Sequence, residues 1–411
     1  MMTLTAFGTL AQASEPDASQ FGFLSGGMSG PARETPTAEA APGDAMAGSS
    51  APAGWSIPEW LHFDVSVQSL YDDNVFLSSS DKESAWINRV IPAVRIVSGK
   101  PEAAVWTFEG AYAPVWSTYA GSGIGNSFDH AVASVLRYNG TRLKAAAFAS
   151  YREVTGNDRY IRDFFTTAVT RGEVLMNYEL TGRTALESRI LWEKTDREDT
   201  GESVYDDDRT TSLQISALWD ATPITKLGPS IRVGYTESSL NPDRTFVDAL
   251  FRMEYDSAAL LKFSAQAGAQ WVSLDSDRGS YWRPSVSLTG QYDMNPLWQL
   301  VFSAYARNNA APSVLNADLQ ATGFNGSVRW KPTGSLQVSL GAGYEKARYE
   351  FFDDSPDRDD DYTYAELLFR AGREDSPFAF EMFYRHRLSN SSNEDLDFRN
   401  NQAGVQISRR F

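Results

Sequence analysis

Segments in which apolar and polar residues alternate recur along most of this 411-residue chain. In one of them, Leu261, Phe263 and Trp271 fall on one face of the expected strand, and Ser264 and Gln266 fall on the other. Side chains alternate between the two faces of a strand, so this period-two pattern predicts β-structure. The same pattern recurs at 61–68, 282–292, 336–345, 378–387 and 402–411. The chain is therefore predicted to be all-β, with one strand face suited to lipid and the other to water.

The connections between these segments alternate in length. Eight short turns rich in Gly, Pro, Asn and Asp lie near 99–101, 139–140, 181–182, 221–223, 256–257, 295–296, 331–334 and 375–377. Nine longer polar links lie at 78–83, 121–126, 156–163, 196–208, 238–243, 276–280, 308–317, 353–361 and 390–394. This asymmetry is typical of outer-membrane barrels, which have short periplasmic turns and long external loops. We expect a transmembrane antiparallel up-and-down β-barrel of about 18 strands.

A soluble β-sandwich or propeller is the alternative fold, because its strands would also alternate. The loop asymmetry and the long strands favour the barrel. Aromatic residues make up 13% of the chain, which suits rings gathered at two bilayer interfaces. We find no apolar run of about 18 residues, the length that a spanning helix needs.

The last segment alternates up to the terminal residue, Phe411. A closing strand that ends on an aromatic residue is the assembly signal that the barrel-insertion machinery reads in outer-membrane barrels, and we assign that role to Phe411. Arg409 places a charge on the apolar face, close enough to the chain end to reach the membrane interface.

The N-terminal part differs in composition from the rest. Residues 1–13 form a short apolar stretch ending in Ala11-Gln12-Ala13, as expected of a partial signal peptide without its positive region. Residues 14–57 are rich in Ala, Pro and Gly, which predicts a disordered periplasmic linker, with a small plug domain as the alternative. Residues 58–411 are assigned to the barrel in the outer membrane of a Gram-negative bacterium.

Charged residues of both signs fall on the predicted inward face. The candidate lumen-lining residues are Arg152, Arg171, Arg189, Arg232, Arg252, Arg283, Arg307, Arg370, Arg385, Glu109, Glu173, Glu254, Glu345, Glu366 and Glu381; Arg399 and Glu187 are also expected to face inward. These side chains either attract a hydrophilic solute to an open pore or pair across neighbouring strands and partly fill the lumen. The two roles are compatible.

Little in the sequence points to catalysis or to a metal. Cysteine is absent, and the three histidines, His62, His130 and His386, have no convincing nucleophile and acid beside them. We expect no enzyme activity, no cofactor and no metal. The acidic runs near 196–199, 206–208 and 353–361 are interpreted as solvated loops rather than as cation sites shared with lipopolysaccharide. A net charge of −16 argues against nucleic acid as a partner.

One stretch resembles a known family. Leu70-Tyr71-Asp72-Asp73-Asn74-Val75-Phe76, followed by an expected strand at 86–96 that contains Pro92, is similar to the opening of the β-barrel porin 2 type of outer-membrane proteins. Members of that group are often linked to exopolysaccharide gene clusters, so the resemblance implies a surface-polysaccharide pore or an accessory to export.

Three functions follow as expectations. The first is a channel that passes, or helps to export, a polar or anionic saccharide. The second is a general diffusion porin for small hydrophilic solutes, and the third is a plugged structural or adhesive barrel of the envelope. Outer-membrane lipid, lipopolysaccharide and the insertion machinery are the expected partners, and the oligomeric state is left open.

Deletion of Phe411 is expected to reduce barrel assembly sharply, because the terminal aromatic is recognised during insertion. The measurement is the fraction of membrane-embedded protein whose gel mobility changes on heating. Wild-type amounts of heat-modifiable barrel after the deletion would contradict this role.

Overall fold

The computed structural model describes residues 58, 60–99, 104–160, 163–198, 205–257, 260–275, 279–310, 317–352, 355–372 and 376–411. The expected signal peptide at 1–13 and linker at 14–57 lie outside these ranges.

The strands are β1 (Leu61–Asp72), β2 (Ala85–Ser98), β3 (Trp106–Tyr112), β4 (Val115–Ala120), β5 (Ser127–Asp129), β6 (Ala131–Asn139), β7 (Leu143–Asn157), β8 (Phe164–Thr181), β9 (Thr184–Arg197), β10 (Asp208–Thr222), β11 (Thr225–Ser238), β12 (Arg244–Asp256), β13 (Leu261–Leu274), β14 (Ser280–Asn295), β15 (Trp298–Ala310), β16 (Ala317–Thr333), β17 (Leu336–Phe351), β18 (Arg358–Ala371), β19 (Phe378–Ser391) and β20 (Phe398–Arg410). One 3₁₀ turn, η3 (Glu394–Leu396), precedes β20. In the described part of the chain, no helix is long and apolar enough to cross a membrane.

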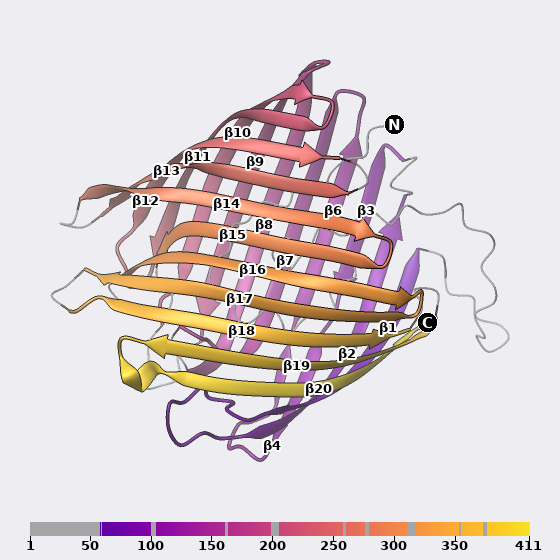
Figure 1. Ribbon diagram of the computed structural model, residues 1–411, viewed down its shortest axis with the longest axis vertical. Coiled ribbons are helices and arrows are strands. Elements are labelled where there is room, and N and C mark those ends of the chain that lie inside the picture. Colours follow the sequence, from indigo (N-terminus) through magenta and orange to yellow (C-terminus); the bar gives the residue numbers. More distant parts are fainter. Residues whose placement is uncertain are drawn as a thin grey trace.

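The strands form one closed antiparallel sheet (Figure 1). β1 pairs with β2, each strand from β6 onward pairs with the next along the chain, and β20 returns to pair with β1 from Asp64 opposite Arg410 to Asp72 opposite Gln402. Segments β3 and β4 both pair with β2, while β3 pairs with β6 and β4 with β5. β3 and β4 thus occupy one strand position in succession, and β5 and β6 occupy the next one, so the twenty segments make eighteen strands. The predicted 18-stranded barrel is confirmed.

Proline explains why one strand of the wall is interrupted. β2 pairs with β3 as far as Val94 opposite Tyr112, and with β4 from Val90 opposite Trp116. The same register places Pro92 opposite Pro114, and neither residue has a backbone N–H to donate. Regular ladder bonds stop at this point.

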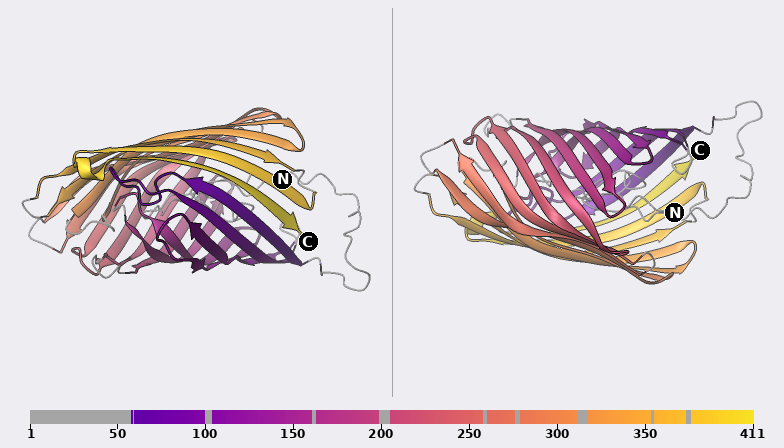
Figure 2. Two further views of the ribbon diagram at one scale, coloured as in Figure 1. Left: turned by 90° about the horizontal axis from the view of Figure 1, so that it is seen from below. Right: turned by 90° about the horizontal axis from the view of Figure 1, so that it is seen from above.

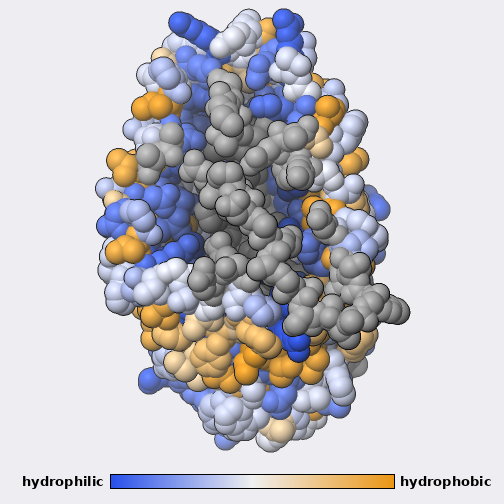
Figure 3. Space-filling view, turned by 90° about the vertical axis from the view of Figure 1, so that its right-hand side faces the viewer, coloured by the Kyte–Doolittle hydropathy of each residue, from blue (hydrophilic) through white to orange (hydrophobic). Residues whose placement is uncertain are grey.

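The burial of side chains is the reverse of that in a soluble protein. Large apolar residues on the outward face are exposed, for example Ile231 at 58%, Phe324 at 60% and Leu340 at 59%. Polar residues on the inward face are buried, among them Gln68 and Gln406. A soluble sandwich would cover its apolar face with a partner sheet, so this pattern excludes that alternative and fits a wall that faces lipid. Figure 3, which views the right-hand side of Figure 1, shows a band of hydrophobic residues across the lower part of this face and hydrophilic residues above it.

Aromatic rings mark both edges of the apolar belt. Near the short turns, Trp298 and Trp330 stack with ring centroids 5.6 Å apart on β15 and β16. Near the long loops, Tyr71 and Trp86 lie 5.4 Å apart on β1 and β2. Such rings sit at the two water interfaces of a bilayer, so the belt runs between these pairs.

The barrel is flattened rather than round. In both views of Figure 2, a wall running from β1 to β9 faces a second wall running from β14 to β20. Residues far apart in sequence therefore face each other across a narrow interior.

The inward assignment of Arg399 is wrong. Arg399 is exposed and lies between the buried residues Phe398 and Asn400, so it points outward. The expected inward position of Glu187 holds, with 7% of the residue exposed.

Gly268 on β13 marks a place where two strands approach too closely for a side chain. A Cβ there would overlap the backbone carbonyl oxygen of Ala249, whereas a Cβ at Gly341 would meet nothing nearer than 3.8 Å. We expect Gly268→Ala to lower the free energy of unfolding by about 1–3 kcal/mol, as overpacking does. Gly341→Ala, on an inward face of β17, is the matched control and should change little. Urea titration in detergent micelles measures both, and equal stability of the two variants would contradict the close approach.

Candidate functional site: the lumen wall and the loop that crosses it

The predicted lumen residues occupy inward-facing positions of their strands. By register and burial, this holds for Glu109 on β3, Arg152 on β7, Arg171 and Glu173 on β8, Arg189 on β9, Arg232 on β11, Arg252 and Glu254 on β12, Arg283 on β14, Arg307 on β15, Glu345 on β17, Glu366 and Arg370 on β18, and Glu381 and Arg385 on β19. That they line a path for solute stays a prediction.

Most of these arginines meet a carboxylate on the same or a nearby strand. The nitrogen–oxygen distances are 2.6 Å for Arg171–Glu173, 2.8 Å for Arg189–Glu173, 2.5 Å for Arg232–Asp248, 2.7 Å for Arg252–Glu254, 2.6 Å for Arg283–Glu350, 2.6 Å for Arg385–Glu366 and 3.3 Å for Arg370–Glu381. Pairing cancels much of the field that a row of free guanidinium groups would project into the lumen. Most of the inward arginines are therefore paired with carboxylates, which is the second of the two roles expected from the sequence.

The link between β7 and β8 carries two residues to the far wall. Eight strands separate β8 from β17 in one direction round the barrel, and seven separate β17 from β7 in the other. Nevertheless Arg159 and Tyr160, from this link, contact Glu345 on β17. These two residues therefore reach across the lumen and connect opposite walls, and we refer to Arg159 and Tyr160 as the crossbar.

Glu345 is the anchor of the crossbar. Its Oε1 accepts from Arg159 Nη2 at 2.7 Å and from the Tyr160 hydroxyl at 3.0 Å. Its Oε2 accepts from Arg307 Nη2 at 3.3 Å and from the Tyr305 hydroxyl. With 2% of its surface exposed, this carboxylate is stable only because two cations and two hydroxyls replace water.

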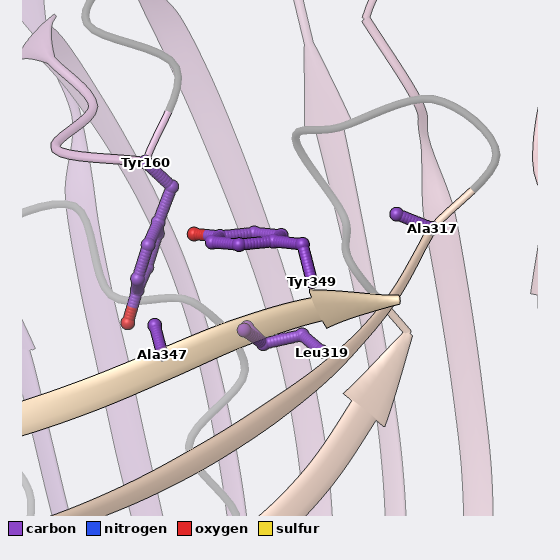
Figure 4. Packing of buried hydrophobic residues seen from close by; sticks show 5 residues of the cluster. All are labelled: Tyr160, Ala317, Leu319, Ala347 and Tyr349. Atoms are coloured by element: carbon purple, nitrogen blue, oxygen red, sulfur yellow. The ribbon is translucent and has the colours of Figure 1, made fainter. Parts of the chain in front are cut away.

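The crossbar also makes apolar contacts with the far wall. Tyr160 packs with Ala317, Leu319, Ala347 and Tyr349 at the loop ends of β16 and β17, and its ring meets that of Tyr349 edge-on (Figure 4). Burial raises the pKa of Tyr160 to about 12; neighbouring Arg159 opposes the rise and Glu345 adds to it. The phenol therefore stays neutral at physiological pH and remains a hydrogen-bond donor to Glu345.

Strands β15 and β16 narrow the same end of the barrel. Pairing between β14 and β15 stops at Val286 opposite Ala306. Beyond that point, Asp318 of β16 accepts from Arg244 Nη1 of β12 at 2.8 Å and from the Tyr281 hydroxyl of β14. These contacts show that the loop end of β16 leans over the inner surface of β12–β14.

One acidic run is not the solvated loop that its sequence suggested. Asp206 is 1% exposed and accepts from Ser238 Oγ at 2.5 Å, Leu240 N at 2.8 Å and Asn241 Nδ2 at 2.7 Å. Its carboxylate orders the neighbouring loop. Within the described ranges, no group of three or more His, Asp or Glu residues is placed to hold a metal ion.

Sequence reasoning missed Arg159, Tyr160, Arg244, Asp318 and Glu350. Arg159 and Tyr160 lie in a long link, where no period-two pattern indicates which way a side chain points. Asp318 and Glu350 fall on the outward phase of their strands, and only the inward lean of β15–β17 brings them to Arg244 and Arg283. No local sequence signal reports that lean.

Comparisons with known proteins identify no family. No protein-family model matches the chain. No curated protein matches it either. The resemblance of Leu70–Phe76 to β-barrel porin 2 proteins therefore has no support beyond the motif itself.

Several solved porins align with most of this chain at low TM-scores. A BenF-like porin from Pseudomonas fluorescens Pf-5 has a TM-score of 0.49 at 10% identity, over 86% of this chain and 99% of its own. OpdK from Pseudomonas aeruginosa with vanillate has 0.46 at 10%, over 85% and 99%. OccAB4 from Acinetobacter baumannii has 0.46 at 9%, over 85% and 98%. Scores this low carry no argument about the solute, so the outer-membrane type of barrel is assigned here from the strand topology and the exposed apolar belt.

The crossbar anchor is testable by substitution. Glu345→Gln leaves Arg159 and Arg307 without a buried counter-charge, and breaking such a pair costs about 3–5 kcal/mol of unfolding free energy. We also expect trypsin to cut after Arg159 in the variant and to spare this bond in the folded wild type. Glu237→Gln, which breaks the half-exposed pair with Arg209, is the control and should cost about 0–1 kcal/mol. A bond after Arg159 that stays protected in Glu345→Gln would show that Glu345 does not hold the crossbar.

Proposed function

We propose that this chain is a passive outer-membrane channel for small hydrophilic solutes. The observation that carries the proposal is the crossbar, which joins opposite walls inside an otherwise polar lumen. A bar across the lumen leaves room only for narrow passages beside it. The polar wall suits solutes that exchange water for hydrogen bonds with Gln, Ser, Arg and Glu side chains.

The same observation argues against polysaccharide export, the first of the three expectations. A polymer needs a continuous wide path, and both crossbar residues bond a single buried carboxylate on the opposite wall. General diffusion of small solutes fits this interior better.

The pairing of charges favours weak discrimination between ions. Arg232, Arg252 and Arg283 each lie within 3.0 Å of a carboxylate oxygen, so none presents an isolated positive charge. A neutralised wall passes solutes mainly by size. We therefore propose a diffusion channel and give up the anionic saccharide as a preferred solute.

Two further proposals concern enzymatic activity and the partners of the barrel. The chain is proposed to have no enzymatic activity; His130 bonds the Tyr112 hydroxyl and His386 bonds Asn401, which leaves both engaged in structural contacts. Contact with lipopolysaccharide at the loop end and recognition of Phe411 by the insertion machinery follow from the barrel's orientation, with the N-terminal segment in the periplasm.

Purified protein in liposomes tests the channel. We expect swelling rates that fall steeply from monosaccharide to trisaccharide, and small single-channel conductance in planar bilayers. Combined Arg159→Ala and Tyr160→Ala should raise conductance several-fold and admit larger sugars, because the crossbar is removed. Arg370→Ala, which removes a half-exposed arginine near the short turns and far from the crossbar, is the control and should keep the wild-type size limit.

Two outcomes would overturn the proposal. Absence of conductance in both wild type and crossbar variant would favour the plugged structural barrel. Entry of high-molecular-weight dextran through the wild-type protein would restore the export function.

A further inference from the structure

The seam is the pairing of β1 with β20, and no short connection between these two strands sets its register. Every other pair of neighbouring strand positions, counting β3–β4 and β5–β6 as one position each, is joined by a turn or a loop, whose length restricts how the two strands align. β1 and β20 come from opposite ends of the barrel sequence and meet only at closure. Their register must therefore come from side chains.

Alternation alone leaves this register ambiguous. A one-residue slip would turn every inward side chain of β20 toward lipid, so the pattern forbids it. A two-residue slip preserves both faces. The inward face of β20 is polar or small at each step along the seam: Asn400, Gln402, Gly404, Gln406 and Ser408.

On the inward face, the carboxylate of Asp72 accepts hydrogen bonds from two side-chain amides of β20. Asp72 Oδ1 accepts from Asn400 Nδ2 at 2.5 Å, and Oδ2 accepts from Gln402 Nε2 at 2.7 Å. Asp72 is 4% exposed and Asn400 is completely buried, so these bonds have little competition from water.

Arginines of β19 orient these amides. Arg387 donates to Asn400 Oδ1 at 2.8 Å, and Arg385 donates to Gln402 Oε1 at 3.3 Å. With each amide oxygen taken by a guanidinium, each amide nitrogen is turned toward Asp72. The seam is thus linked through side chains to the hairpin that precedes it.

On the outward face, the next residue repeats the arrangement. Asp73 Oδ1 accepts from the backbone N–H of Asn401 and Oδ2 from its Nδ2, both at 2.6 Å. The side-chain oxygen of Asn401 contacts His386 Nδ1 and the Tyr384 hydroxyl, each at 2.8 Å. The seam is therefore bonded from both faces of the wall at its loop end.

We propose that Asp72 and Asp73, with Asn400, Asn401 and Gln402, form a clasp that selects the register in which the last strand closes on the first. A two-residue slip places either Gly404 or Phe398 where Asp72 now has an amide, so a slip in either direction removes one of its two bonds. This function concerns assembly and is independent of what the barrel conducts.

The clasp also gives a role to the stretch Leu70–Phe76. Asn74, completely buried, donates to the backbone oxygen of Arg399 at 3.1 Å and bonds Ser78 through both its amide atoms. Val75 then packs with Leu70, Ala85 and Ile87 inside the wall. The segment leaves the first strand by fastening to the last one.

Engineered disulfides can report this register because the chain has no cysteine. Ser66 and Ser408 face each other with their Oγ atoms 2.8 Å apart, so Ser66→Cys with Ser408→Cys reports the native register. Ser66→Cys with Gln406→Cys, or with Arg410→Cys, reports a slip of two residues in one or the other direction. Each reporter pair is placed in the full-length protein and oxidised after membrane insertion.

Asn401→Asp is the test variant, because it sets a second carboxylate against Asp73. We expect native cross-linking to fall several-fold and a slipped cross-link to appear. Adding Asp73→Asn swaps the pair and should restore the native cross-link. Asp64→Asn, at the other end of the same seam where Asp64 and Arg410 are 3.5 Å apart, is the matched control and should leave cross-linking unchanged.

Native cross-linking that is undiminished in Asn401→Asp would overturn the proposal. If this variant yields no assembled barrel, recovery by the swap supports the clasp. Failure of the swap to recover either assembly or cross-linking overturns it, since the damage would then not arise from this pair.

Discussion

A bilayer interior offers no water to backbone N–H and C=O groups, and this constraint shapes the whole molecule. Every strand must pair on both sides, so the sheet has to close by bringing β20 to β1. Where Pro92 and Pro114 remove donors, the ladder is interrupted but the wall continues through β3 and β4. Closure is also the step with least local guidance, which is why side chains such as Asp72 and Asn400 matter at that seam.

The same lack of water governs the charged side chains of the interior. A buried carboxylate or guanidinium is tolerated when partners replace its hydration, and the lumen meets this condition with ion pairs on the same or nearby strands. Glu345 extends the rule across the barrel, since it receives partners from both β15 and the β7–β8 link. Electrostatic pairing thus stabilises the wall and at the same time fills part of the space inside it.

These contacts link structure to the proposed transport. The lumen is polar, but its charges are largely neutralised and a crossbar divides it, which suits small solutes sorted by size. The loop after β1 also meets the strand that follows the crossbar, where Phe76 packs edge-on against Phe164 at the start of β8 with ring centroids 6.1 Å apart. The closing seam and the crossbar therefore lie at the same end of the barrel, the end that carries the long loops.

The sequence by itself determined the fold class, the number of strands and the inward phase of residues such as Arg232 and Glu345, because period-two alternation and turn residues are local signals. It misassigned Arg399, which the last strand presents outward next to buried Asn400. Only the tertiary structure decided that Arg159 and Tyr160 cross to Glu345, that Asp318 reaches Arg244, and that Asp73 bonds Asn401. The physical reason is that these contacts join residues far apart in the chain, and their geometry follows from barrel curvature and strand lean rather than from any local pattern.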